Sequence, residues 1–379
     1  MKVSFHRQAL SEVLSLATGI VPSRSPKPVL ACVRLATASL PAGRVVQIVC
    51  TDGQMTLETY LQQVDIKQDG VLLLPAIKFA DIVNNSPDET ISITASHEKA
   101  TLTGKDSSIT LLGFSAEGYP PIESFDGKAD FSIQAGTLKR MIDCTRFAAA
   151  REMSRYAING VLFEVKSKKL VLVATDGHRM AQTREDIKTE ETKELSAVVP
   201  IKAIAHIEKL LSDAEATIEM QFRENKVFVQ VFTAAQDNGQ KAVKASFSST
   251  LVEGVFPPYQ DVIPKDCDRK ANIQCAPFSS SVRRASLMTS DDSRAVKLAF
   301  TNNQLDLVGR SAELGEARIT MPVEYSGAAT ELGFNPQYLL EAVKVSPTES
   351  FNFEFKSQGP ALMRFGKSFS YIIMPVNIP

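Results

Sequence analysis

Three stretches of the chain share one pattern, an extended apolar run that ends in a threonine and a turn. The runs are QIVCTDGQMTLE with Thr51, LVLVATDGHRMAQ with Thr175 and VKLAFTNNQLDLVG with Thr301. The threonines follow one another at intervals of 124 and 126 residues. Because self-similarity at a fixed period marks a repeated structural unit, the sequence predicts three copies of one unit.

Each copy also contains two stretches in which apolar residues recur at helical spacing. The upstream stretches are SFHRQALSEVLSLATGIV, FSIQAGTLKRMIDCTRFA and IQCAPFSSSVRRASLMT, and in the first of them Leu10, Val13, Leu14 and Ala17 form one stripe. The downstream stretches, LLPAIKFADIV, VVPIKAIAHIEKLL and LGFNPQYLLEAV, open on or near a proline. Proline suits the first helical position because its φ is fixed and its missing N–H is not needed there. We therefore expect strand, helix, several strands, helix and strands in each copy.

Between the helices the sequence alternates apolar and polar residues, as in NGVLFEVKSKKLVLVATDG, where residues 167–169 can close a hairpin. Such alternation is typical of antiparallel sheets with one solvated face. The proline-containing segments GYPPIESFDGK and FPPYQDVIPKD separate the copies, as linkers do. The predicted fold class is α+β, with three repeated domains, each of two helices packed on antiparallel sheet. The predicted domains cover residues 1–125, 126–256 and 257–379.

Composition adds limits to this picture. The chain has 379 residues, of which 44% are hydrophobic and 22% charged, which is typical of a globular protein. Its five cysteines are odd in number and scattered, without a CxxC pair, so we expect free thiols and neither a disulfide framework nor a metal site. We also expect no cofactor. The start lacks a signal-peptide pattern and no window is apolar enough for a membrane span, which predicts a cytoplasmic protein without membrane contact.

The formal net charge of −1 hides an uneven distribution. The predicted helical windows carry +3 over residues 137–151, +2 over 278–290 and zero over 6–21, 76–86, 200–213 and 336–346, so the rest of the chain carries −6. This division is expected if the helices face a polyanion, because Lys and Arg contacts to phosphate dominate non-specific nucleic-acid binding. Amphipathic helices that simply point cations at solvent are the alternative. The candidate DNA-binding residues are Arg24, Lys27, Lys139, Arg140, Arg146, Arg151, Arg155, Arg283 and Arg284.

A catalytic site is not indicated. Of the four histidines only His178 lies in a dense polar motif, Thr175-Asp176-Gly177-His178-Arg179. A strand-end turn explains the Asp and the Gly of this motif, and no nucleophile elbow, phosphate-binding loop or metal-binding motif accompanies it. We expect Gly177 to permit the bend, with His178 and Arg179 projecting beside it, and no catalytic residues.

Six motifs in order resemble one protein family. They are RYAINGVLFE, ATDGHRMA, FPPYQDVIP, SRAVKL, GFNPQYLLEAV and the terminal YIIMPVNIP, and together they span the second and third copies. They resemble the bacterial DNA polymerase III β subunit, the sliding clamp. The resemblance covers essentially the full length of the chain, and the motifs occur in the same order. The resemblance implies a head-to-tail homodimer that closes into a ring, with helices lining the hole and sheets outside. It implies a non-catalytic protein that encircles double-stranded DNA without sequence preference and tethers the replicative polymerase.

The resemblance also implies sites. Partners of the family, which include the polymerase subunit, the clamp loader and repair polymerases, insert a short peptide into a pocket between the second and third domains. The matching positions are Ile158, Thr175, Gly177, His178, Arg179, Met180, Pro257, Val262, Ile372, Met374, Pro375 and Val376. The ring contact matches Ile109, Leu287 and Met288, for which ordinary core positions are the alternative.

The pocket rim departs from the family pattern at two positions. Asp261 stands where the family usually has Arg, and Asn377 stands in a tail that commonly reads M-P-M-R-L. Two other functional hypotheses remain open at this point. One is a duplicate clamp with a specialised role in repair, on a plasmid or in drug resistance, and the other is an enzyme that uses Asp176 and His178.

Overall fold

The computed structural model describes residues 1–40, 43–152, 156–189, 194–233, 242–289 and 295–377. The chain forms two compact units. The first comprises Met1–Leu138, Lys188–Glu191 and Lys202–Leu251, and the second comprises Lys139–Ile187, Thr192–Ile201 and Val252–Pro379. Along the sequence, the order strand, helix, strands, helix, strands occurs three times, which confirms the predicted repeat.

Each predicted helical stretch contains one α-helix. The helices in the described residues are α1 (Arg7–Thr18), α2 (Ala76–Asn85), α3 (Ala135–Asp143), α4 (Ile201–Leu210), α5 (Cys275–Ser286) and α6 (Pro336–Lys344). Helix α1 buries the predicted stripe of apolar residues. Helix α6 starts with Pro336, and the Asn335 side chain caps it by accepting a hydrogen bond of 2.9 Å from the Gln337 N–H. No helix among the residues that the structure describes is long and apolar enough to cross a membrane.

The helix predicted within residues 137–151 is shorter than expected. Helix α3 ends at Asp143, and after it come Cys144, Thr145 and the 3₁₀ turn η3 (Arg146–Ala148). The Thr145 hydroxyl donates to the carbonyl oxygens of Met141 (2.9 Å) and Ile142 (3.3 Å), a local bond that competes with helix continuation. Arg146 and Arg151 are therefore not on the helix. Only part of the positive charge predicted for this helix lies on helix α3.

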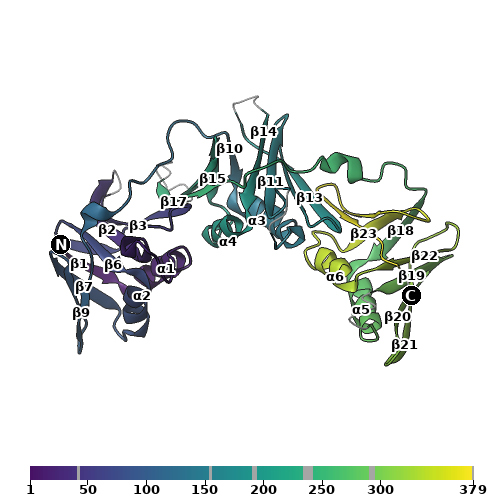
Figure 1. The fold of residues 1–379 in the computed structure, drawn as a ribbon, viewed down its shortest axis with the longest axis horizontal. Helices are drawn as coiled ribbons and strands as arrows, with labels where there is room; N and C mark the ends of the chain where they lie inside the picture. Colours follow the sequence, from purple (N-terminus) through teal and green to yellow (C-terminus); the bar gives the residue numbers. More distant parts are fainter. Residues whose placement is uncertain (41–42, 153–155, 190–193, 234–241, 290–294, 378–379) are drawn as a thin grey trace. The chain divides into compact units, whose positions relative to one another are not determined.

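The first unit contains two antiparallel sheets, and helices α1 and α2 pack together beside them (Figure 1). The five-stranded sheet has the order β5 (Val64–Gln68), β1 (Lys2–His6), β7 (Thr90–Ser96), β8 (Lys99–Thr103), β9 (Ser108–Leu112). The eight-stranded sheet has the order β10 (Phe131–Gln134), β15 (Thr217–Arg223), β16 (Lys226–Phe232), β17 (Val243–Thr250), β4 (Met55–Leu61), β3 (Gly43–Thr51), β2 (Cys32–Leu40), β6 (Val71–Pro75).

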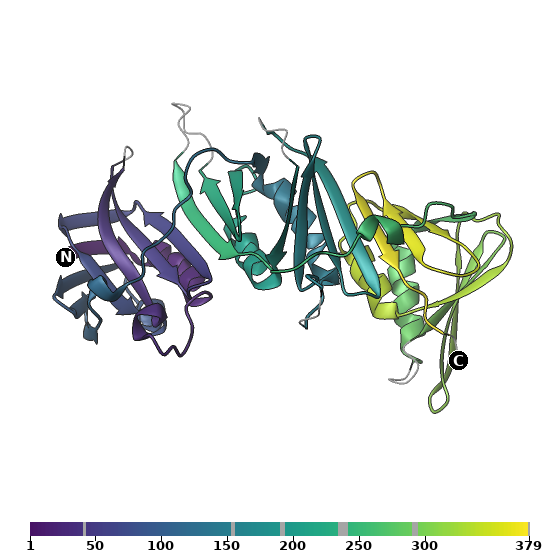
Figure 2. The same cartoon turned by 45° about the horizontal axis from the view of Figure 1, so that its top comes forward.

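Strands of the first and second repeats therefore belong to one sheet. The junction is the β17–β4 pair, in which Ala245 lies opposite Thr59 and Phe247 opposite Leu57. The turn η2 (Ala116–Gly118) precedes the extended segment that leads to β10, and Figure 2 shows this segment crossing the sheet of the first unit.

The second unit is built in the same way, with helices α5 and α6 packed together. Its eight-stranded sheet has the order β14 (Leu195–Pro200), β11 (Gly160–Lys166), β12 (Lys169–Thr175), β13 (Arg179–Asp186), β25 (Phe369–Ile373), β24 (Ala361–Phe365), β23 (Ser350–Phe355), β18 (Arg269–Gln274). Its four-stranded sheet has the order β21 (Gly315–Pro322), β20 (Gln304–Ser311), β19 (Val296–Thr301), β22 (Thr330–Phe334). The β13–β25 pair joins the second repeat to the third.

The turn predictions are confirmed at residue level. Strands β3, β12 and β19 end at Thr51, Thr175 and Thr301. The predicted hairpin joins β11 to β12 through Ser167 and Lys168, whose φ values of 50° and 63° match a tight two-residue turn. All five cysteines have free thiols, and burial raises the pKa of Cys32 to about 11 and those of Cys50 and Cys144 to about 12. These thiols stay protonated and unreactive near neutral pH.

Candidate functional site

The turn between β12 and β13 is fixed by hydrogen bonds to its own backbone. The Thr175 hydroxyl donates to the Arg179 carbonyl (2.6 Å) and accepts from the Gly177 N–H (3.1 Å). Asp176 Oδ1 accepts from the backbone N–H groups of His178 (3.0 Å) and Arg179 (3.1 Å), and Gly177 has a φ of 90°, which only glycine adopts at low cost. The predicted turn chemistry is confirmed. The Asp176 carboxylate is engaged by these backbone groups and by the Arg179 side chain, and His178 is exposed.

An apolar cluster lies beside this turn. Met180 on β13 and Ile372 on β25 face each other across the strand pair and are only 3% and 2% exposed. The cluster is made of Ala157, Leu162, Val173, Met180, Val198, Tyr259, Leu362 and Ile372. Two of its members were predicted. Of the others, Leu162, Val173, Val198 and Leu362 lie on strands, while Ala157 precedes β11 and Tyr259 lies in the 3₁₀ turn after residue 258, so only the folded chain brings them together.

Three of the predicted apolar residues lie close in sequence to members of this cluster and are exposed. Val262, in the 3₁₀ turn η4 (Tyr259–Val262), is 50% exposed, and Met374 and Val376 of the C-terminal tail are 42% and 40% exposed. The tail is held by its backbone, because the Met374 N–H donates to the His178 carbonyl (2.9 Å) and the Val376 N–H donates to the Gly333 carbonyl (2.8 Å). The predicted residues Ile158, Pro257 and Pro375 are partly buried. A buried apolar cluster with exposed apolar side chains nearby in sequence supplies the kind of lining that a peptide site requires.

Two polar residues next to these apolar ones in sequence are also exposed. Asp261 and Asn377, where the chain departs from the family pattern, are both exposed. Tyr259 fixes η4 because its hydroxyl donates to Glu164 Oε2 on β11 (2.7 Å).

Arg179 does not project as the sequence suggested. Its side chain is 8% exposed and turns inward, where the guanidinium pairs with Asp176 and Glu341. Burial alone would lower the pKa of this guanidinium, but Tyr371 and Glu341 raise it above its usual range. The side chain is therefore a permanent buried cation. Hydrophobic periodicity gave no signal of this contact, because the partners outside the turn lie in η3 and α6, which are distant in sequence.

The predicted DNA-binding cations are exposed wherever the structure describes them. Arg24 and Lys27 lie on the loop between α1 and η1 (Pro28–Ala31), and Arg283 and Arg284 lie in the last turn of α5. Lys139 and Arg140 lie on α3, while Arg146 and Arg151 follow it. Arg140 pairs with Glu185 (2.9 Å) and Arg146 with Asp143 (3.7 Å), so part of this charge is compensated locally. Arg155 lies outside the described residues.

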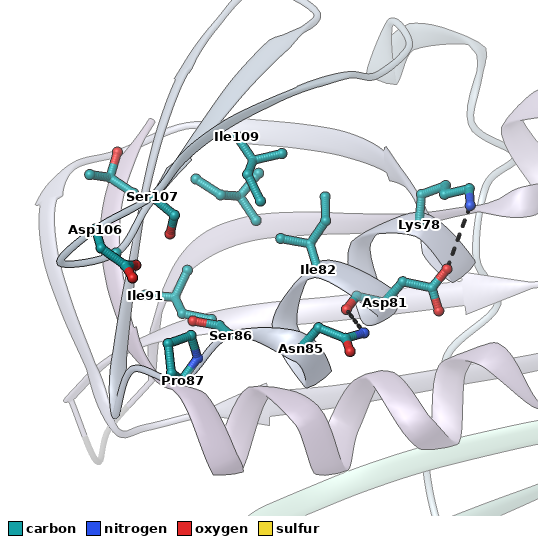
Figure 3. A pocket seen from close by; sticks show the side chains of 13 residues that line it. Lys78, Asp81, Ile82, Asn85, Ser86, Pro87, Ile91, Asp106, Ser107 and Ile109 are labelled. Atoms are coloured by element: carbon teal, nitrogen blue, oxygen red, sulfur yellow. Dashed lines mark hydrogen bonds and ion pairs between the residues drawn. The ribbon is translucent and has the colours of Figure 1, made fainter.

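A separate cleft of about 410 Å³ lies in the first unit between helix α2 and strand β9. Figure 3 shows Ile82, Ile91 and Ile109 grouped around it, with Lys78 and Asp106 toward its two ends. Ile109 is 41% exposed and is therefore not a core residue. The cleft is lined by Lys78, Asp81, Ile82, Asn85, Ser86, Pro87, Ile91, Leu102, Thr103, Gly104, Asp106, Ser107 and Ile109.

The other predicted ring-contact residues lie at the end of helix α5. Leu287 is 71% exposed and Met288 is partly buried, so the alternative of ordinary core residues is wrong for Leu287. In the same unit β21 is an edge strand of its sheet, as β9 is in the first unit. An exposed leucine and open strand edges are features that stable proteins usually cover with a partner.

Sequence models of one family match almost the whole chain. The N-terminal, central and C-terminal domains of the DNA polymerase III beta subunit match residues 1–123, 132–258 and 260–377. The chain belongs to the DNA polymerase III beta subunit family.

Individual members of the family agree over the full length. The "Beta sliding clamp" of Pseudomonas aeruginosa is 29% identical over 387 aligned residues, and that of Escherichia coli K12 is 27% identical over 382, with complete coverage of both chains in each comparison. The crystal structure of the Pseudomonas aeruginosa sliding clamp bound to griselimycin has a TM-score of 0.90 at 29% identity and complete coverage. This beta subunit thus shares the fold of solved sliding clamps.

Proposed function

We propose that this beta subunit is a non-catalytic sliding clamp that encircles duplex DNA in the cytoplasm and tethers the replicative polymerase. The observation that carries the proposal is the match of all three repeats, in order, to sliding clamps. Tethering raises the effective concentration of the polymerase at the template without a catalytic group. The relatives named above carry the name beta sliding clamp. The alternative hypothesis of a specialised duplicate clamp is therefore not favoured.

A closed ring needs a head-to-tail contact between two copies. The cleft beside Ile109 offers an apolar recess, and Leu287 is an exposed apolar side chain that a recess in a second copy can cover. The edge strands β9 and β21 can pair between copies, which removes two open edges at once. Because the two surfaces differ, the contact is heterologous and closes only as a ring.

The peptide site is proposed to take the apolar anchors of polymerase, clamp-loader and repair-protein segments. Support comes from the buried pair Met180 and Ile372 and from the exposure of Val262 and Met374, which the family resemblance assigns to the same site. Griselimycin, which the Pseudomonas aeruginosa clamp binds, is proposed to occupy the same site and is a convenient probe.

The direct test of function is DNA synthesis on a long primed circle with the polymerase and loader of the same bacterium. Adding this protein is expected to convert short products into full-length circles at limiting polymerase. Products of unchanged length would contradict a clamp function.

The exposed cations on helix α5 give a prediction about DNA binding. Replacing Arg283 and Arg284 with serine should weaken association with duplex DNA and lower the slope of log affinity against log salt by about one for each phosphate that the protein no longer neutralises. The control replaces Lys166 and Lys169, two exposed lysines of β11 and β12, with serine. Affinity measured across a range of salt should fall for the helix variant only, and an equal decrease in both variants would contradict helices that face DNA.

A further inference from the structure

The first unit contains a turn with the same hydrogen bonds as the turn of the peptide site. The Thr51 hydroxyl donates to the Met55 carbonyl (2.8 Å) and accepts from the Gly53 N–H (3.1 Å). Asp52 Oδ1 accepts from the N–H groups of Gln54 (2.8 Å) and Met55 (2.7 Å), and Gly53 has a φ of 93°. Each of these bonds has its counterpart 124 residues later, in the turn from Thr175 to Arg179.

The likeness extends to the strand that follows each turn in space. The Thr250 N–H donates to the Gln54 carbonyl (3.0 Å), as the Met374 N–H donates to the His178 carbonyl (2.9 Å). The fifth residue differs, because the first turn has Met55, 7% exposed, where the second has Arg179. The turn therefore forms without an arginine, and the reason for Arg179 must lie outside the turn.

Arg179 connects the turn to two other elements of the second unit. Its Nε donates to Asp176 Oδ2 (2.9 Å), its Nη2 donates to the carbonyl of Phe147 in η3 (2.9 Å), and its Nη1 donates to Glu341 Oε2 in α6. Three donors of one planar group are thus used on three acceptors, which lysine could not reproduce.

Aromatic rings enclose the same guanidinium. It lies 4.1 Å from the centre of the Tyr338 ring of α6 and 5.5 Å from that of Phe147, and the Phe147 ring packs on Tyr371 of β25 (5.7 Å between centres). Stacking on an aromatic face stabilises a desolvated guanidinium. From the turn, Arg179 therefore contacts both helix α6 and η3.

We propose that Arg179 is a positioning residue of the peptide site, which holds helix α6 and η3 against the turn and does not touch the bound peptide. The inference rests on the proposed peptide site. It assigns to Arg179 the difference between the two turns. Both have the same backbone hydrogen bonds, but among the described residues only the second turn is joined to a helix of the following repeat by a side-chain hydrogen bond.

The variant Arg179→Met tests this role, because it installs the residue that the first turn carries. The turn should form as before, since Met55 supports the same bonds. Amide hydrogens of α6 should exchange faster in the ligand-free variant, and griselimycin affinity measured by calorimetry should fall about tenfold. Arg364→Met is the control, since it removes another ion-paired arginine of the same sheet, the partner of Glu354 at 3.0 Å. It should leave both readouts unchanged.

A double-mutant cycle separates positioning from direct contact. Glu341→Gln should weaken griselimycin binding in the wild-type background but have little further effect in Arg179→Met, because both changes break one connection. Lower affinity with unchanged α6 exchange, or additive effects of the two changes, would overturn the proposal in favour of a direct contact. If griselimycin does not bind the unmodified protein, the proposed peptide site fails, and α6 exchange alone still decides whether Arg179 positions the helix.

Discussion

The variant Leu287→Asp is expected to be a monomer. An unpaired carboxylate buried in an apolar contact costs about 3–5 kcal/mol, and both contacts of the ring carry the change. The dissociation constant of the dimer should therefore rise by about a thousandfold or more. Sedimentation or light scattering should give twice the 41.4 kDa chain mass for the unmodified protein and the single chain mass for the variant.

A matched control is available in the second unit. Val255 is 79% exposed and belongs neither to the cleft nor to helix α5, so Val255→Asp should remain a dimer. A dimeric Leu287→Asp protein would show that the exposed end of α5 is not part of the ring contact. An unmodified protein that is monomeric at all accessible concentrations would contradict ring closure itself.

Removing residues 374–379 is expected to weaken peptide binding severely without changing the dimer. The deletion removes the exposed Met374 side chain from the rim and the two backbone hydrogen bonds that hold the tail to His178 and Gly333. Removal of an exposed anchor of this size, together with the ordered rim, should weaken binding by about a hundredfold or more, as for interface hot spots. The affinity for griselimycin, measured by titration, should fall by this factor, and the protein should no longer stimulate the polymerase.

The mass of the truncated protein in solution is its control. It should equal that of the full-length dimer, because the cleft beside Ile109 and the end of α5 are intact. Unchanged griselimycin affinity would remove the tail from the binding site. Dissociation of the dimer would show that the deletion has damaged more than the site.

The repeats and helices could be predicted from sequence because they depend on local pattern. Thr51, Thr175 and Thr301 end their strands at nearly constant spacing, and the apolar stripe of Leu10 and its neighbours requires only helical periodicity. Helix length was less accessible. Helix α3 ends at Asp143, where the Thr145 hydroxyl bonds to the Met141 carbonyl, a side-chain bond that apolar spacing does not report.

The candidate sites were predictable where a motif carries them and not where distant strands meet. The turn at Gly177 follows from its sequence, whereas Leu362 joins the apolar cluster beside it only through the order of strands in the sheet. Arg179 reads as an exposed polar residue of a turn, and its burial arises from Phe147, Tyr338 and Glu341, which only the folded chain brings together. The sequence alone could not distinguish Leu287 from a core residue, because its exposure is seen only in the folded structure.

The most direct test of DNA encirclement compares circular with linear DNA. Labelled protein is loaded onto a nicked circle by the clamp loader, separated from free protein by gel filtration, and followed before and after one restriction cut. We expect the protein to stay with the closed circle and to leave within the dead time of the experiment once the DNA is linear, because a ring escapes only over an end. Equal dissociation from circular and cut DNA would contradict a ring that encloses the duplex.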